Sequence, residues 1–98
     1  MNLGKAIRSI RKERKLTQAD VASKAGLSIT ALSQIEKGES QPQKNTLESI
    51  CSVLGVTKNH IFFMALDVED ISDERKVAFN VLYEPLRKLI LEDIKTTY

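Results

Sequence analysis

The chain contains little of what metal sites, cross-linked folds and most catalytic centres are built from. Among its 98 residues there are one cysteine (Cys51), one histidine (His60) and no tryptophan. A single cysteine excludes an intrachain disulfide, and a four-ligand zinc site needs more Cys and His than the chain has. The sequence also offers no acid–base pair around a histidine, so we expect neither an enzyme nor a bound cofactor or metal.

Long apolar runs are also absent. No stretch approaches the roughly 18–20 apolar residues of a membrane-spanning helix, so we expect no membrane partner. Residues 1–8 contain no apolar signal region, and we therefore expect the protein in a reducing cytoplasm. With 42% hydrophobic and 29% charged residues, the composition is that of a globular protein of about one domain.

The charge is divided unevenly along the chain. Residues 1–66 carry ten Lys/Arg against five Asp/Glu, a net charge of +5, whereas residues 67–98 carry five against eight, a net charge of −3. Together they give the +2 of the whole chain. A basic front half favours a polyanionic partner, although two ordinary solvated faces would give the same composition.

Apolar residues recur at three- and four-residue steps, which predicts an all-α fold. We expect helices over residues 3–15, from Thr17 to Gly26, over residues 28–37 and 46–54, and from Thr57 to Met64. The first helix directs its apolar face inward and carries basic side chains on its other faces. These basic residues are Lys5, Arg8, Lys12, Arg14 and Lys15.

The second and third predicted helices are bounded by local signals. Thr17 and Asp20 have the spacing of a capping box, Gly26 suits a left-handed turn, and Ser28 suits the N-cap of the next helix. Small or apolar residues stand at each position where two helices joined by such a turn must touch. These residues are Val21, Ala22, Leu27, Leu32 and Ile35. The pattern is that of a helix-turn-helix with a polar outward face on its second helix.

The last third of the chain differs from the rest. An acidic connector, Asp67–Asp73, leads to Ser72 as a predicted N-cap. Pro85 removes one helical hydrogen bond, so we expect a kink or two helices, about 73–83 and 85–96. The region holds more apolar residues than one stripe of a surface helix requires, and these must be covered by the domain, a twin chain or another partner. They are Val77, Ala78, Phe79, Val81, Leu82, Tyr83, Leu86, Leu89, Ile90, Leu91 and Ile94.

Residues 3–66 resemble the helix-turn-helix family of the lambdoid phage repressors and Cro, also called the xenobiotic-response-element (XRE) family of bacterial regulators. The resemblance covers about two thirds of the chain. It is carried by Ile7-Arg8-x-x-Arg11, Leu16-Thr17-Gln18-x-x-Val21-Ala22, Gly26-Leu27-Ser28, Ile35-Glu36-x-Gly38, Pro42, Thr46-Leu47 and Leu54-Gly55-Val56.

The resemblance implies a five-helix lambda-repressor-like DNA-binding domain at residues 1–66, followed by a C-terminal helical extension at residues 67–98. It further implies a sequence-specific transcriptional regulator, a repressor or autoregulator of a bacterium or phage. Such a protein binds a palindromic operator in double-stranded DNA as a homodimer, with half-sites about 34 Å apart.

The resemblance also assigns roles to single residues. The helix at residues 28–37 enters the major groove, where an amide such as that of Gln34 can bond an adenine and an apolar side chain such as Ile29 can contact a thymine methyl. The expected base-reading residues are Ser28, Ile29, Thr30, Ser33 and Gln34. The expected phosphate-binding residues are Gln18, Lys37, Gln41, Gln43 and Lys44, with Arg8 and Lys12 adding charge. Arg11 and Glu36 are expected to form a structural ion pair.

Two questions stay open on the sequence alone. The resemblance nominates Ile61, Phe62 and Phe63 for dimerisation, and the apolar tail is a second candidate for the same role. The alternative function is an antitoxin, whose tail binds a toxin protein while the front half binds DNA.

Overall fold

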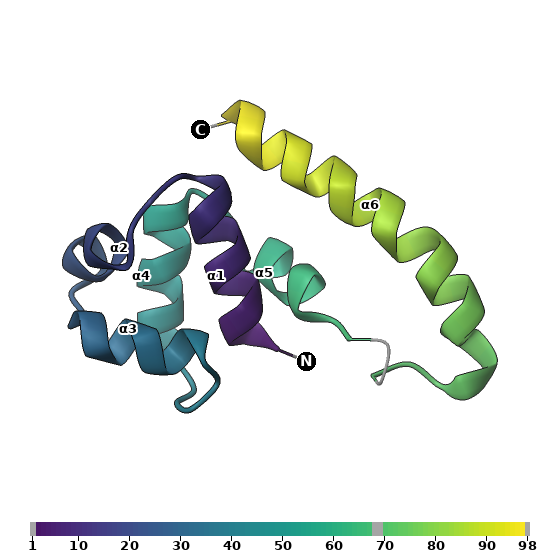
Figure 1. The fold of residues 1–98 in the computed structure, drawn as a ribbon, viewed down its shortest axis with the longest axis horizontal. Coiled ribbons are helices and arrows are strands. Elements are labelled where there is room, and N and C mark those ends of the chain that lie inside the picture. The colour runs from purple at the N-terminus through teal and green to yellow at the C-terminus, as the bar shows by residue number, and fades with distance from the viewer. Residues whose placement is uncertain (1, 68–69, 98) are drawn as a thin grey trace.

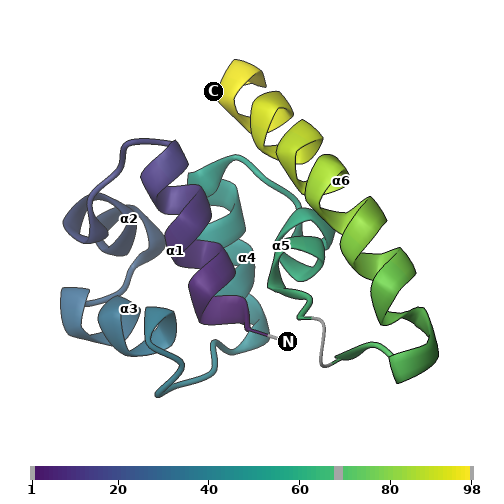
Figure 2. The same cartoon turned by 45° about the vertical axis from the view of Figure 1, so that its right-hand side comes forward.

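The computed structural model describes residues 2–67 and 70–97, which form six α-helices and one short 3-10 helix, with no strand among them. In chain order they are α1 (Leu3–Glu13), α2 (Gln18–Ala25), α3 (Ile29–Glu36), α4 (Lys44–Leu54), α5 (Lys58–Ala65), the 3-10 helix η2 (Asp73–Arg75) and α6 (Lys76–Thr97). Helices α1–α5 cluster into one body, and α6 runs along the side of that body opposite α2 and α3 (Figures 1 and 2). The all-α prediction is confirmed.

The predicted signals that bound α2 and begin α3 are confirmed. The Thr17 hydroxyl accepts from the Asp20 backbone N–H at 3.0 Å, and the Asp20 carboxylate accepts from the Thr17 backbone N–H at 3.0 Å. This reciprocal pair lowers the pKa of Asp20, chiefly through the Thr17 backbone N–H. Gly26 follows α2 with φ +74°, and the Ser28 hydroxyl caps α3 by accepting from the Ala31 backbone N–H at 3.0 Å.

Two helix boundaries differ from the prediction. Helix α1 ends at Glu13 rather than at residue 15, because Lys15 takes the left-handed conformation with φ +59° and its backbone N–H bonds back to Lys12. Helix α4 begins at Lys44 rather than at residue 46, since Gln43, the residue after Pro42, is already its extended N-cap.

The core lies where α1–α5 meet. Fully buried side chains come from all five helices, among them Ile7, Ile50 and Ile61. The two predicted anchors of α3, Leu32 and Ile35, are 0% and 5% exposed. Helix α1 crosses α3 closely at Gly4, where an added Cβ would stand 2.2 Å from the Ile35 carbonyl oxygen. Only a residue without a side chain allows this approach.

The prediction that Arg14 lies on the solvated face of α1 is wrong. Arg14 is 6% exposed, and its Nε donates to the Leu54 carbonyl at 2.9 Å. Its Nη2 donates to the Gly55 carbonyl at 3.3 Å. The guanidinium therefore caps the C-terminal end of α4, where backbone carbonyls lack helical partners. The long apolar stem of arginine makes such burial of the side chain tolerable.

Of the two alternatives predicted at Pro85, a kink or two helices, the second is wrong. Pro85 lies inside the continuous helix α6, and Ser72, at the N-cap of η2, makes no side-chain capping bond. Because Pro85 and Val81 are both exposed, water can bind the Val81 carbonyl that the proline leaves without a donor. Residues 68 and 69 of the predicted connector, and the side chain of Ile94, lie outside the described residues.

Helix α6 docks on α5 through aromatic rings. Tyr83 stacks on Phe63 and Phe79 with ring centroids 5.1 and 4.8 Å apart. Its hydroxyl donates to the backbone carbonyls of Phe63 at 3.1 Å and Met64 at 3.3 Å. Burial raises the pKa of Tyr83. None of the helices in residues 2–67 and 70–97 is long and apolar enough to cross a membrane.

Candidate nucleic-acid interface

Helix α3 presents the predicted base-reading residues at the surface. Ser28, Thr30 and Gln34 are exposed, and Ser33 is half-buried. Ile29, at the first position of the helix, is 53% exposed although it is apolar. Leu32 and Ile35 anchor the opposite side of the same helix in the core. An eight-residue helix thus has a mixed polar and apolar edge available for a groove and a rigid support behind it.

The C-terminal end of α3 is held by a buried ion pair. Arg11 Nε donates to Glu36 Oε2 at 2.8 Å, and Arg11 Nη2 donates to Glu36 Oε1 at 3.0 Å. The side chains of Arg11 and Glu36 are 10% and 2% exposed. A third donor of Arg11, Nη1, binds the Leu16 carbonyl at 2.9 Å, so one guanidinium fixes α3 to α1 and to the turn before α2. Such bidentate pairs are geometrically specific.

Gln18 supports α3 directly, a role that the family resemblance implies for it. Its side-chain Nε2 donates to Glu36 Oε1 at 3.0 Å, which ties the first residue of α2 to the last residue of α3. One amide hydrogen is used in this bond, while the side-chain oxygen and the second amide hydrogen have further bonding capacity. The sequence contains Gln18, Glu36 and Arg11, but it does not show that the Gln18 amide bonds the Glu36 carboxylate.

A cleft of about 610 Å³ opens between α1, the start of α2 and the end of α3. Gln18, Ser33 and Lys37 line it. Arg8 of α1, which we expected only to add charge, lines it as well. Arg8 and Lys37 are both exposed. The cleft therefore combines two cations with the N-terminal end of α2, and both features favour an anion.

The other predicted phosphate-binding residues gather where the chain enters α4. Gln41, Gln43 and Lys44 are all exposed. Gln43 is the N-cap of α4 but makes no side-chain capping bond, so its amide is not used within the helix start. The loop that carries these residues connects directly from the end of α3 (Figure 1). Gln41 and Gln43 thus lie on the loop that follows α3, and Lys44 begins α4; none of the three lines the cleft around Gln18.

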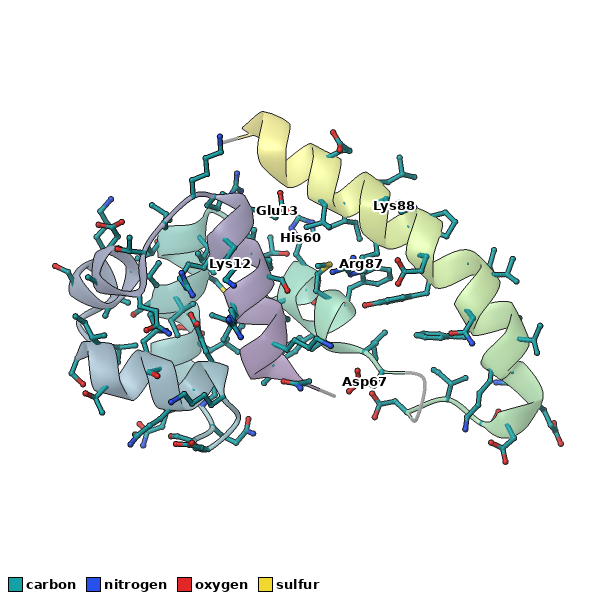
Figure 3. All side chains as sticks on the ribbon, in the orientation of Figure 1. Lys12, Glu13, His60, Asp67, Arg87 and Lys88 are labelled. Carbon is teal, nitrogen blue, oxygen red and sulfur yellow. The ribbon has the colours of Figure 1, made fainter. Side chains whose placement is uncertain are left out.

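A second cleft, of about 390 Å³, lies between α6 and the body. Asp67 and Arg87 are among the residues that line it, and Arg87 lies between α5 and α6 (Figure 3). Among the described residues, no group of three His, Cys, Asp or Glu could hold a metal ion. His60, a residue of α5, has a buried Nδ1 without a hydrogen-bond partner. Burial raises the pKa of the Cys51 thiol in the core.

Comparison with known proteins decides the family. The family model described as helix-turn-helix matches residues 7–61, which span α1 to α5 up to Ile61. The chain belongs to this family. The match covers both α2 and α3, the turn between them and the buried Arg11–Glu36 pair, so the fold of this helix-turn-helix protein is the lambda-repressor-like, XRE-type fold that the motifs indicate.

Curated relatives carry names of regulators. The chain is 46% identical over 56 residues to the immunity repressor protein of Bacillus phage phi105, covering 57% of this chain and 39% of that protein. It is 39% identical over 57 residues to the HTH-type transcriptional regulator DdrOP3 of Deinococcus deserti, covering 58% and 44%. The chain therefore spans less than half the length of these two relatives.

One relative aligns with the tail as well. The chain is 30% identical over 91 residues to the uncharacterized HTH-type transcriptional regulator YqaE of Bacillus subtilis, covering 93% of this chain and 76% of that protein. No solved structure matches the chain. The chain thus belongs to a helix-turn-helix family, and the relatives named here are a phage immunity repressor and transcriptional regulators.

Proposed function

We propose that the protein binds a palindromic operator as a homodimer and acts there as a repressor or autoregulator in the cytoplasm. The observation that carries this proposal is the two-sided character of α3. Its inner side chains, Leu32 and Ile35, are at most 5% exposed, whereas Ile29 on its outer side is 53% exposed. A helix that is anchored from behind and apolar at its exposed tip suits a major groove, where Ile29 meets thymine methyl groups.

Base reading falls to the N-terminal and outward residues of α3, namely Ser28, Ile29, Thr30, Ser33 and Gln34. The exposed Gln34 amide matches the donor and acceptor that adenine presents in the major groove. The hydroxyl groups of Ser28, Thr30 and Ser33 bond with less selectivity, since they donate or accept equally well.

Phosphate binding falls to two sets of residues on either side of α3. One set is Gln18 and Lys37 at the first cleft, together with Arg8, which the cleft adds to the predicted set. The other is Gln41, Gln43 and Lys44 at the start of α4. Contacts of this kind fix the position of the protein on the duplex and carry no sequence information directly.

The experiment that tests the proposal selects bound sequences from a random DNA pool and then titrates the best one at two salt concentrations. We expect a palindromic consensus. Gln34→Ala should relax the preference at one base pair of each half-site by about 1–3 kcal/mol. Lys44→Ala should weaken all sequences alike and reduce the salt dependence by about one phosphate contact. A pool that returns no consensus overturns the proposal, and identical behaviour of the two variants overturns the division into reading and anchoring residues.

A further inference from the structure

Helix α6 leaves an apolar face without a partner. Val77, Val81 and Leu82 are 75%, 65% and 62% exposed, and Leu86 and Leu89 are 47% and 66% exposed. These five residues are here called the α6 stripe. At about 100° per residue they spread over roughly half of the helix circumference, the half that faces away from Tyr83. Between Val77 and Leu89, a stripe of this kind runs along more than three helical turns.

The body of the protein cannot cover the α6 stripe while α6 stays docked. The opposite side of α6 is already committed, because Tyr83 stacks on Phe63 and binds two carbonyls at the end of α5. Ile90 and Leu91 are half-buried against the core in the same way. Rotating the helix to bury the stripe would expose these contacts, so the stripe requires an occupant from outside the chain.

Most of the α5 surface that the resemblance nominates for dimerisation is buried within the chain itself. Ile61 is fully buried, and the ring of Phe63 is covered by Tyr83 of the same chain. Only Phe62 keeps appreciable exposure, at 36%. One partly exposed phenylalanine offers far less than the roughly 1,000 Å² that a specific interface buries. In this chain, α6 therefore takes the place on α5 that a second copy would occupy.

The α6 stripe suits a second copy of itself. Taking on the order of 100 Å² for each exposed Val or Leu, two stripes together bury at most about 1,000 Å², which is the lower limit of a specific interface. A two-fold axis sets residues near its centre against their own copies, so a charge there would repel itself. The middle of the stripe, at Val81, Leu82 and Leu86, is uncharged.

We propose that the α6 stripe is the seam of a homodimer, in which two α6 helices pack face to face about a two-fold axis. The inference rests on the proposed operator binding for its symmetry. Because α1 and the rest of the body lie between α3 and α6 (Figures 1 and 2), this seam sets the two α3 helices farther apart than a seam on α5 does. We therefore expect the half-sites to lie farther apart than a seam on α5 would place them.

The test compares sedimentation equilibrium of the full chain with that of two charge variants, all without DNA. Leu82→Glu places a carboxylate in the stripe, whereas Asn80→Glu adds the same charge at an exposed α6 position outside it. We expect dimers for the unchanged chain and for Asn80→Glu. Leu82→Glu should raise the dissociation constant at least about 100-fold, because the two-fold axis buries the introduced charge twice.

A second measurement, thiol cross-linking, gives an answer even if the charge variants fail to fold. Leu82→Cys and Asn80→Cys are treated with a short thiol cross-linker, against a background in which Cys51 is only 5% exposed. We expect covalent dimers from Leu82→Cys alone. A monomeric unchanged chain overturns the inference, and so does a dimer that Leu82→Glu leaves intact or that Asn80→Cys links equally well.

The outcomes separate this inference from the proposed function. If the chain dimerises through α6 but selects no DNA consensus, the seam stands and operator binding fails. If the chain is a monomer that still prefers one half-site sequence, DNA reading stands and the seam is overturned. A monomeric chain that instead forms a one-to-one complex with a toxin protein through Leu82 also overturns the seam.

Discussion

Removing the buried Glu36 carboxylate should destabilise the protein far more than removing an exposed carboxylate does. In Glu36→Ala, the guanidinium of Arg11 keeps its place in a site that is 8% exposed, but it loses the acceptors at 2.8 and 3.0 Å. Gln18 loses its acceptor at 3.0 Å as well. Breaking a buried pair from one side costs about 3–5 kcal/mol, because an uncompensated charge remains inside. We expect a loss of that size in the free energy of unfolding.

The chain offers a matched control for this change. Glu48 pairs with Lys58 at 3.3 Å, but both side chains are exposed, at 47% and 41%. Exposed pairs contribute about 0–1 kcal/mol, so Glu48→Ala should change the stability little. Both variants remove one carboxylate from a helix, and they differ mainly in the burial of the partner. Urea unfolding followed by circular dichroism measures both.

A double variant separates charge from packing. Replacing Arg11 by Met and Glu36 by Leu removes both charges and keeps most of the side-chain volume, and such replacements are often neutral or stabilising. We therefore expect Arg11→Met with Glu36→Leu to be more stable than Glu36→Ala alone. If Glu36→Ala costs no more than Glu48→Ala, the reasoning that α3 depends on a desolvated pair is refuted.

Three further predictions concern other parts of the fold. Gly4→Ala should lower the unfolding free energy by about 1–3 kcal/mol, the cost of overpacking, because its Cβ would meet the Ile35 carbonyl; thermal unfolding measures this. Asp20 has a lowered pKa, so its stabilising effect exists above the ordinary value of 3.8 and is lost as the pH falls; Asp20→Asn should flatten that acid slope. Tyr83 has a raised pKa, so α6 docking should weaken as the pH rises above about 10, and Tyr83→Phe should expose α6 amides to hydrogen exchange.

The parts of the fold that are predictable from the sequence depend on neighbours along the chain. Thr17 and Asp20 are three residues apart, so the capping box needs only its own turn. Gly26 and Ser28 likewise act on the residues beside them. The outward side of α3 follows from helical periodicity once Leu32 and Ile35 are recognised as its core. The predicted reading residues other than Ser33 are exposed for the same reason.

The features that escaped prediction depend on residues far along the chain. Arg14 bonds carbonyls that lie 40 and 41 positions away, and nothing near it in the sequence marks them. In the sequence, Gly4 is only a residue that disfavours a helix. The structure shows that α3 passes close to it at the Ile35 carbonyl. The expectation of two helices at Pro85 failed for the opposite reason. A local rule was applied at an exposed site, where water can bind the carbonyl that the proline leaves without a donor.

The buried pair also explains how an acidic residue can end the helix that we propose lies against DNA. A lone carboxylate at Glu36 would repel the duplex, since phosphate contacts dominate affinity. Arg11 neutralises this charge at 2.8 Å, so Lys37 and Arg8 set the sign of the field at the cleft. Removing only Arg11 leaves a negative charge under the interface, whereas removing only Glu36 leaves a positive one. At equal loss of stability, Arg11→Met should therefore weaken DNA binding more than Glu36→Gln, and the difference should shrink as salt screens the charges.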